Sequence, residues 1–508
     1  MTLLLKNVRI LGGAREFPDL VDVFVMQDKI SAIGPLPNKR ADVVLDGQGA
    51  YLSPGFIDVN AASDHYLTIF DYPSQFDFIK QGVTTIFGGT CGSSLAPLLY
   101  GGLESLQKWG GSPDKINVNW HTMAEFLASM DQHPLAVNFG TLIGHATIRR
   151  ALIGESLRDL SKNELAVFGE TVRKSMKEGA FGLSTGLGYV HDRPTPYSEL
   201  KMLVQIVKEN RGVYATHLRH YDLGIGAAVE ETLKLARETG IRTVIDHFVP
   251  LLSAKKEYEK ALSEIEALPP AVDVKFDIYP FDTMLLPIYT FLPEWAQTGG
   301  REIMLANVKD EWFLTRVKRE MAKPEGECCV VAQAPGNDFL VGKTMLEVKH
   351  IYGLGDVRDA LFRLMVATGL RGTMLYKSLD GKLIRKALAS RRSMIASNAP
   401  SFNEAPHFNF QKMLKTERST STFSKFLSIA AEGLMPLEDA IRKITLQPAR
   451  EFGLIGRGEI KEGNFADLAC FGRGGECKFT VVNGKVVYRD GEFQNQFPGK
   501  ALRHGSQG

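Results

Sequence analysis

Short apolar runs alternate with longer amphipathic segments through the middle of the chain. Eight of the runs have the length and apolar content of buried strands: residues 54–60, 82–89, 136–144, 180–186, 212–218, 242–248, 274–280 and 393–399. Most follow an amphipathic stretch such as residues 225–240, which ends in a glycine typical of a helix C-terminus. Eight strands with crossover helices predict an α/β fold, a (β/α)8 barrel, with its chemistry at the carboxyl ends of the strands.

Both ends of the chain instead show short strands separated by turns. They occupy residues 3–11, 21–34 and 41–47 at one end, and residues 466–472 and 478–493 at the other. Asn-Gly and Asp-Gly pairs in the last segment mark hairpin turns. Since neither end is long enough to bury its own faces, we expect the two ends to pair into one small β domain.

The predicted domains follow from these patterns. Residues 1–53 and 451–508 are assigned to the small β domain, and residues 54–450 to the barrel. Residues 284–376 are too many for one βα loop and contain polar helical segments, which predicts a small inserted subdomain.

Composition excludes several classes of protein. The 508 residues are 44% hydrophobic and 23% charged, as in ordinary globular proteins, and the net charge of +2 gives no reason to expect a nucleic-acid or membrane partner. No apolar run approaches a membrane span, and the start of the chain lacks a signal peptide, so a cytoplasmic location is expected. Five scattered cysteines are too few for a disulfide framework.

Polar residues with possible chemical roles stand at the ends of the predicted barrel strands: Asn60, Cys91, His145, His217, His247 and Asn398. Cys91, His217 and His247 are of the types that bind zinc, and a thiolate with two imidazoles leaves a fourth position open for catalysis. A single histidine in such a place is more often structural. The three together are informative because barrel strand ends face one mouth.

Many motifs in order along nearly the whole chain carry a resemblance to a known family: "PGFID", "GVTTIFGGTCGSSLAP", "IGHATIRRALIG", "GAFGLSTGLGYV", "YATHLR", "DIYPF" and "LQPAREFGLIGRGEIKEGNFADL". The chain resembles the amidohydrolase superfamily and, within it, the N-acyl-D-amino-acid deacylases. The resemblance implies one or two zinc ions at the barrel mouth and hydrolysis of a non-peptide C–N bond in a small N-acyl amino acid.

The resemblance also implies roles for single residues. Cys91, His217 and His247 fall on metal ligands of the family, which implies one bound zinc ion. Tyr189 falls on a tyrosine that contacts substrate, whereas for His145 a structural role is favoured over a catalytic one.

The chain departs from the family where metal binding and catalysis are concentrated. Asn60 and Ala62 replace the His-x-His pair of one metal position, and Ser63 replaces an acid. Asn398 replaces the aspartate that serves as general base, and an amide has no lone pair basic enough for that role. Val249 replaces a lysine that meets the substrate carboxylate in many relatives.

Nearby residues are not expected to compensate. Asp64 and His65 lie past the strand, so we expect neither to restore the lost metal position. Asp246, next to His247, is predicted to point to the opposite face of its strand.

Three hypotheses remain open for the function. The favoured one is a divergent homologue that is crippled or inactive in the family's reaction, and so a pseudoenzyme that binds a small ligand or serves in assembly. The second is an active hydrolase with one zinc ion on Cys91, His217 and His247. The third is a different reaction, with a base supplied by the inserted segment.

Overall fold

The centre of the molecule is a closed barrel of parallel strands. The computed structural model describes residues 1–15, 17, 19–100, 102–109, 116–321, 324–402 and 413–506. The barrel strands are β6 (Phe56–Asp58), β7 (Val83–Gly88), β8 (Asn138–Thr141) continued by β9 (Ile143–Gly144), β10 (Gly182–Gly186), β11 (Val213–His217), β12 (Arg242–Ile245), β13 (Val274–Ile278) and β17 (Ser393–Ile395). Neighbouring strands pair in parallel, and the backbone N–H of Asn398 donates to the carbonyl of Asn60 (2.8 Å) where the last strand meets the first. The predicted fold class is confirmed.

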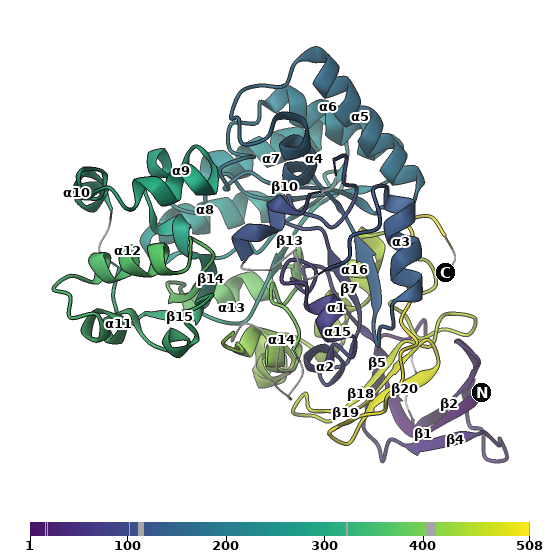
Figure 1. Cartoon of the computed structure of the whole chain (residues 1–508). Coiled ribbons are helices and arrows are strands. Elements are labelled where there is room, and N and C mark those ends of the chain that lie inside the picture. The colour runs from purple at the N-terminus through teal and green to yellow at the C-terminus, as the bar shows by residue number, and fades with distance from the viewer. Residues whose placement is uncertain are drawn as a thin grey trace.

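Helices cover the outside of the barrel (Figure 1). They are α3 (Met123–Gln132), α4 (His145–Ile153), α5 (Lys162–Lys177), α6 (Tyr197–Glu209), α7 (Ile225–Thr239), α8 (Lys255–Glu266), α13 (Gly381–Ala389), α14 (Glu417–Ile429), α15 (Leu437–Ile444) and α16 (Leu446–Glu451). Ser161 opens α5 with a reciprocal capping box, and Gly240 ends α7 at a φ of 65°. Apolar side chains pointing inward, among them Phe87, Phe181 and Met394, fill the barrel interior.

The two chain ends form one β unit, as predicted. The nine-stranded sheet contains β1 (Thr2–Ile10), β2 (Val21–Met26), β3 (Lys29–Gly34), β4 (Val43–Asp46), β5 (Tyr51–Pro54), β18 (Leu468–Phe471), β19 (Cys477–Val482), β20 (Lys485–Arg489) and β21 (Glu492–Phe493). The antiparallel pair β5–β18 joins the N-terminal strands to the C-terminal ones. Figure 1 shows these purple and yellow strands together at the lower right.

A second unit lies between β13 and β17 in the chain. Its antiparallel sheet consists of β14 (Thr283–Pro287), β15 (Cys329–Gln333) and β16 (Thr373–Lys377). Its helices are α9 (Gly300–Asn307), α10 (Glu311–Glu320), α11 (Met345–Ile351) and α12 (Val357–Ala367), and they lie on the left of Figure 1. The unit has a hydrophobic cluster of its own. The domain borders expected from the sequence stay predictions.

In the part of the chain that the structure describes, every helix is too short or too polar to span a membrane.

Candidate active site

The side chains of Cys91, His217 and His247 converge at the mouth of the barrel. Cys91 follows β7, His217 ends β11 and His247 follows β12. The Sγ of Cys91 lies 3.4 Å from Nε2 of His247, which lies 2.9 Å from Nδ1 of His217. One ligand atom from each residue lies within 4.8 Å of the others. Ligands of a tetrahedral zinc ion stand roughly 3.3–3.6 Å apart, given bonds of about 2.0–2.3 Å, so the donor set and its spacing suit zinc.

Three residues of the site adopt left-handed backbone conformations. The φ angles are 51° for Cys91, 34° for His247 and 44° for Asn398. A non-glycine residue in this region costs on the order of 1–3 kcal/mol and persists only where the surroundings enforce it. Here each backbone N–H is held: that of Cys91 donates to Asp246 Oδ2 (3.3 Å), that of His247 to Asp277 Oδ1 (2.9 Å), and that of Asn398 to the Asn60 carbonyl.

Asp246 corrects one prediction. Strand alternation placed its side chain on the face opposite to His247, but β12 ends at Ile245, and beyond that point the alternation of a pleat no longer holds. Asp246 is buried beside the site, and the Cys91 thiol lies 3.9 Å from its Oδ2. Burial raises the pKa of Asp246 above its usual range.

Asp277 also lies in the site. It is buried, and one oxygen accepts from the backbone of His247 while the other accepts from the amide Nδ2 of Asn60 (3.2 Å). Burial and the neighbouring Asp246 raise the pKa of Asp277 well above its usual range. Its position near the end of β13, at the start of "DIYPF", was the available signal.

Asn60 and Ala62 lie outside the Cys91, His217 and His247 cluster. The amide oxygen of Asn60 accepts from the Thr90 hydroxyl (2.9 Å), so both ends of this side chain are engaged. Ala62 packs into an apolar cluster with Tyr66, Trp109, Leu285 and Ala332.

The side chains of Asp64 and His65 form contacts outside the Cys91, His217 and His247 group. Oδ2 of Asp64 accepts from the backbone N–H of Gly89 (2.6 Å). The ring of His65 is stacked on Trp109, with ring centroids 5.5 Å apart, and its Nε2 lies 3.1 Å from the Ser93 carbonyl. Neither joins the Cys91, His217 and His247 group.

Asn398 follows β17, and its side chain is partly exposed. Beside it lies a buried cation that sequence reasoning missed. Arg418, in α14, is 2% exposed, its Nε donates to the Ser397 carbonyl (3.1 Å), and its guanidinium stacks 4.3 Å from the centre of the Tyr279 ring. Its Nη1 has no hydrogen-bond partner among the described residues, and its charge opposes the rise that burial causes in the pKa of Asp58. Arg418 therefore contacts the residue that immediately precedes Asn398.

Two tyrosines flank the histidines. The ring centroid of Tyr189 lies 4.5 Å from that of His217, and burial raises the pKa of Tyr189 well above its usual range. Tyr221, which the sequence did not single out, donates its hydroxyl to the Asp246 carbonyl (2.8 Å) and lies 4.9 Å from the His217 ring. Tyr189 therefore lies beside His217, and its contact with substrate stays a prediction.

His145 belongs to a separate buried network. Its Nδ1 lies 2.8 Å from Asp192 and its Nε2 lies 2.9 Å from Glu199, which also accepts from Arg149 (2.6 Å). Burial alone would lower the pKa of His145, but Asp192 and Glu199 reverse this effect and raise the pKa to about 9. These contacts favour the structural role expected for this histidine.

We expect this network to make stability depend on pH. The folded-state pKa of His145, about 9, lies above the ordinary value of 6.5, so the folded protein binds the proton more tightly. The stabilisation is complete below pH 6.5 and is lost as the pH rises to 9, by up to about 3 kcal/mol. Urea unfolding at pH 6 and pH 9 should show a larger loss for the wild type than for His145→Gln. Parallel losses in the two proteins would contradict the assignment.

Comparisons with known proteins agree with this architecture. An amidohydrolase family model matches residues 343–487. D-aminoacylase from Alcaligenes xylosoxydans xylosoxydans is 30% identical, over 98% of this chain and 97% of that protein. N-acyl-D-glutamate deacylase from the same organism is 27% identical, over 97% and 94%. A solved structure of D-aminoacylase, from work on its binuclear metal centre with one-metal activation and second-metal attenuation, is 25% identical, covers 99% of both chains and has a TM-score of 0.79.

Proposed function

Because this chain belongs to the D-aminoacylase family of amidohydrolases, we propose that it binds one zinc ion and an N-acylated amino acid but is crippled in hydrolysing the C–N bond. The convergence of Cys91, His217 and His247 on one point carries this proposal. A zinc ion held there would act as a Lewis acid on the acyl carbonyl. Tyr189, beside His217, would contact the ligand.

We propose no second metal ion at the position where the family has the His-x-His pair. Asn60 offers a neutral amide already engaged by Thr90 and Asp277, and Ala62 offers no donor atom. A single ion is compatible with the family, since one-metal activation is described for D-aminoacylase.

The loss of catalysis is assigned to Asn398. Asn398 lies three residues beyond the end of β17, and a carboxamide cannot accept the proton of an attacking water. General acid–base catalysis contributes about 10²–10⁴-fold to a rate, so this single replacement accounts for a very slow reaction.

The alternative is an active hydrolase with one zinc ion. Asp246 favours it, because this carboxyl lies 3.9 Å from the Cys91 thiol and so beside the proposed ion. The hypothesis of a base from the inserted segment stays open: Leu285, Ala332 and Leu375 of that segment pack in the same apolar cluster as Ala62.

Metal analysis tests the proposal. We expect about one zinc ion per chain in the purified protein and none in Cys91→Ala. Cys470→Ala, which removes a buried thiol of the terminal β sheet, is the matched control and should retain the ion. A folded wild type that takes up no zinc would overturn the proposal.

Assays with a panel of N-acyl-D-amino acids separate the proposal from its alternative. Turnover at ordinary enzymatic rates that is lost in Cys91→Ala would establish the active hydrolase.

The proposal also includes two expectations from the sequence. The protein is located in the cytoplasm, and its ligand is a small molecule.

A further inference from the structure

Tyr221 lies in the loop that leads from β11 to α7 and contacts both histidines of the proposed zinc site. Its ring centroid is 4.9 Å from that of His217 and 5.3 Å from that of His247. Its hydroxyl accepts a hydrogen bond from the backbone N–H of Leu218 (3.0 Å) and donates one to the backbone carbonyl of Asp246 (2.8 Å). One side chain therefore connects the backbone that follows the first histidine to the backbone that precedes the second.

The peptide group that joins Asp246 to His247 is held at both of its ends. Its carbonyl accepts from the Tyr221 hydroxyl, and its N–H donates to Oδ1 of Asp277 (2.9 Å). Because a peptide group is planar, hydrogen bonds at its two ends fix the orientation of the whole plane. The φ angle of His247, 34°, describes rotation next to this plane and lies in the left-handed region. The Tyr221 hydroxyl thus helps to hold His247 in a backbone conformation that is costly by itself.

The peptide group that joins His217 to Leu218 is held in the same way. Its carbonyl accepts from the backbone N–H of Leu187 (3.1 Å), and its N–H donates to the Tyr221 hydroxyl. β11 and β12 are paired neighbours, and the last residue pair of their ladder precedes both histidines. Past the end of this ladder, the Tyr221 hydroxyl connects the two strand ends that carry the imidazoles.

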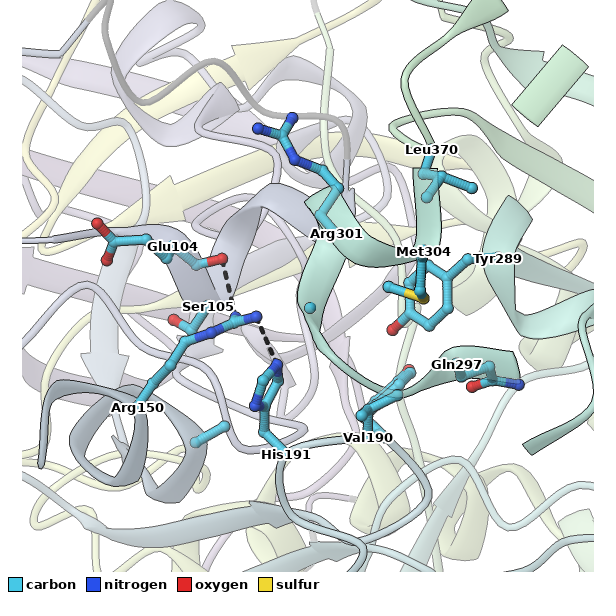
Figure 2. A pocket seen from close by; sticks show the side chains of 13 residues that line it. Glu104, Ser105, Arg150, Val190, His191, Tyr289, Gln297, Arg301, Met304 and Leu370 are labelled. Carbon is cyan, nitrogen blue, oxygen red and sulfur yellow. Dashed lines mark hydrogen bonds between the residues drawn. The ribbon is translucent and has the colours of Figure 1, made fainter. Parts of the chain in front are cut away.

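A second tyrosine contacts His217, but its surroundings are different. The ring centroid of Tyr189 is 4.5 Å from that of His217, and Tyr189 also lines a cavity of about 60 Å³ between the loop after β10 and the inserted segment (Figure 2). The described lining of this cavity does not include Tyr221, whose hydroxyl bonds to two backbone groups. Since the hydroxyl hydrogen of Tyr221 is already donated to a carbonyl, this residue acts on the geometry of the site rather than on a ligand.

We propose that Tyr221 is a positioning residue, whose hydroxyl sets the orientation of His217 and His247 toward the metal. The inference rests on the proposed function, because it assigns what holds two ligands of the proposed ion. Replacing a residue that orients metal ligands from outside the coordination sphere typically weakens metal binding by about 10–100-fold. Tyr221→Phe removes only the hydroxyl and keeps the ring beside both imidazoles, so it isolates this contribution.

Zinc affinity is the first test. Competition with a chromophoric chelator gives the dissociation constant of zinc for the wild type, Tyr221→Phe and Tyr197→Phe. We expect Tyr221→Phe to bind zinc about tenfold or more weakly than the wild type. Tyr197→Phe is the matched control and should keep the wild-type affinity, because it also loses a hydroxyl hydrogen bond, to Glu238 (2.9 Å), but on a helix outside the barrel. Thermal unfolding of the metal-free proteins checks that both variants are folded.

Amide hydrogen exchange of the metal-free proteins is a second readout, and it does not require zinc. The Leu218 N–H loses its acceptor in Tyr221→Phe, so we expect it to exchange about fivefold or more faster than in the wild type and in Tyr197→Phe. Faster exchange at Leu218 together with weaker zinc binding, in a variant that unfolds like the wild type, supports the inference.

The two measurements also separate this inference from the proposed function. Equal zinc affinities of the wild type and Tyr221→Phe would overturn the inference and leave the zinc site in place. A folded wild type that takes up no zinc overturns the proposed function, and the exchange rate of Leu218 then decides whether Tyr221 holds the two histidines. An exchange rate that is unchanged in Tyr221→Phe contradicts the inference, whether or not zinc binds.

Discussion

Replacing Asn398 by aspartate is expected to raise the rate of hydrolysis of N-acyl-D-amino acids by about 10²–10⁴-fold, the usual contribution of a general base. The backbone at this position is already held by Asn60, so the new carboxylate starts from the conformation seen here. The buried guanidinium of Arg418, which donates to the carbonyl of the adjacent Ser397, offsets part of the cost of introducing a negative charge. Single-turnover and steady-state assays of Asn398→Asp against the wild type measure the gain.

Two controls accompany this substitution. Asn398→Ser, which adds a small polar group without a base, should show no gain, and Cys91→Ala combined with Asn398→Asp should lose it. The further changes Asn60→His and Ala62→His address the second metal position, although an imidazole at residue 62 must enter the apolar cluster at a cost of about 1–3 kcal/mol. An inert protein after all three reversions would show that the pocket differs from its relatives in more than these residues.

Glu199→Ala is expected to destabilise the protein by about 3–5 kcal/mol, because it leaves two buried groups without their partner. Arg149 is 1% exposed and donates to both oxygens of Glu199 (2.7 and 2.6 Å), while His145 lies 2.9 Å from the same carboxylate. Removing the acid leaves a buried guanidinium without its carboxylate. Urea unfolding of the two proteins at pH 6 measures the loss.

Glu230→Ala is the matched control for this change. Glu230 is exposed and pairs with Arg237 (3.1 Å) on the surface of α7, so its loss should cost less than about 1 kcal/mol. Equal unfolding midpoints for Glu199→Ala and Glu230→Ala would show that the buried network contributes nothing to stability.

The sequence by itself determined the barrel, the terminal β domain and the residue types at the strand ends. Strand and helix periodicities arise from local burial, and parallel strands necessarily present their carboxyl ends at one mouth. For that reason Cys91, His217 and His247 were expected together and are found together. The neutral residues at positions 60, 62 and 398 are likewise visible in the sequence alone.

Only the tertiary structure decided which side chains surround these residues at the strand ends. Asp246 was misplaced because its strand ends at Ile245, whereas the predicted strand ran on to residue 248. Arg418 lies 20 residues beyond Asn398 in the chain, and one cavity is lined both by α4, with Arg150, and by α9, with Met304, more than a hundred residues apart. Contacts between such distant segments depend on how packed elements meet, and no local pattern of apolar and polar residues encodes that.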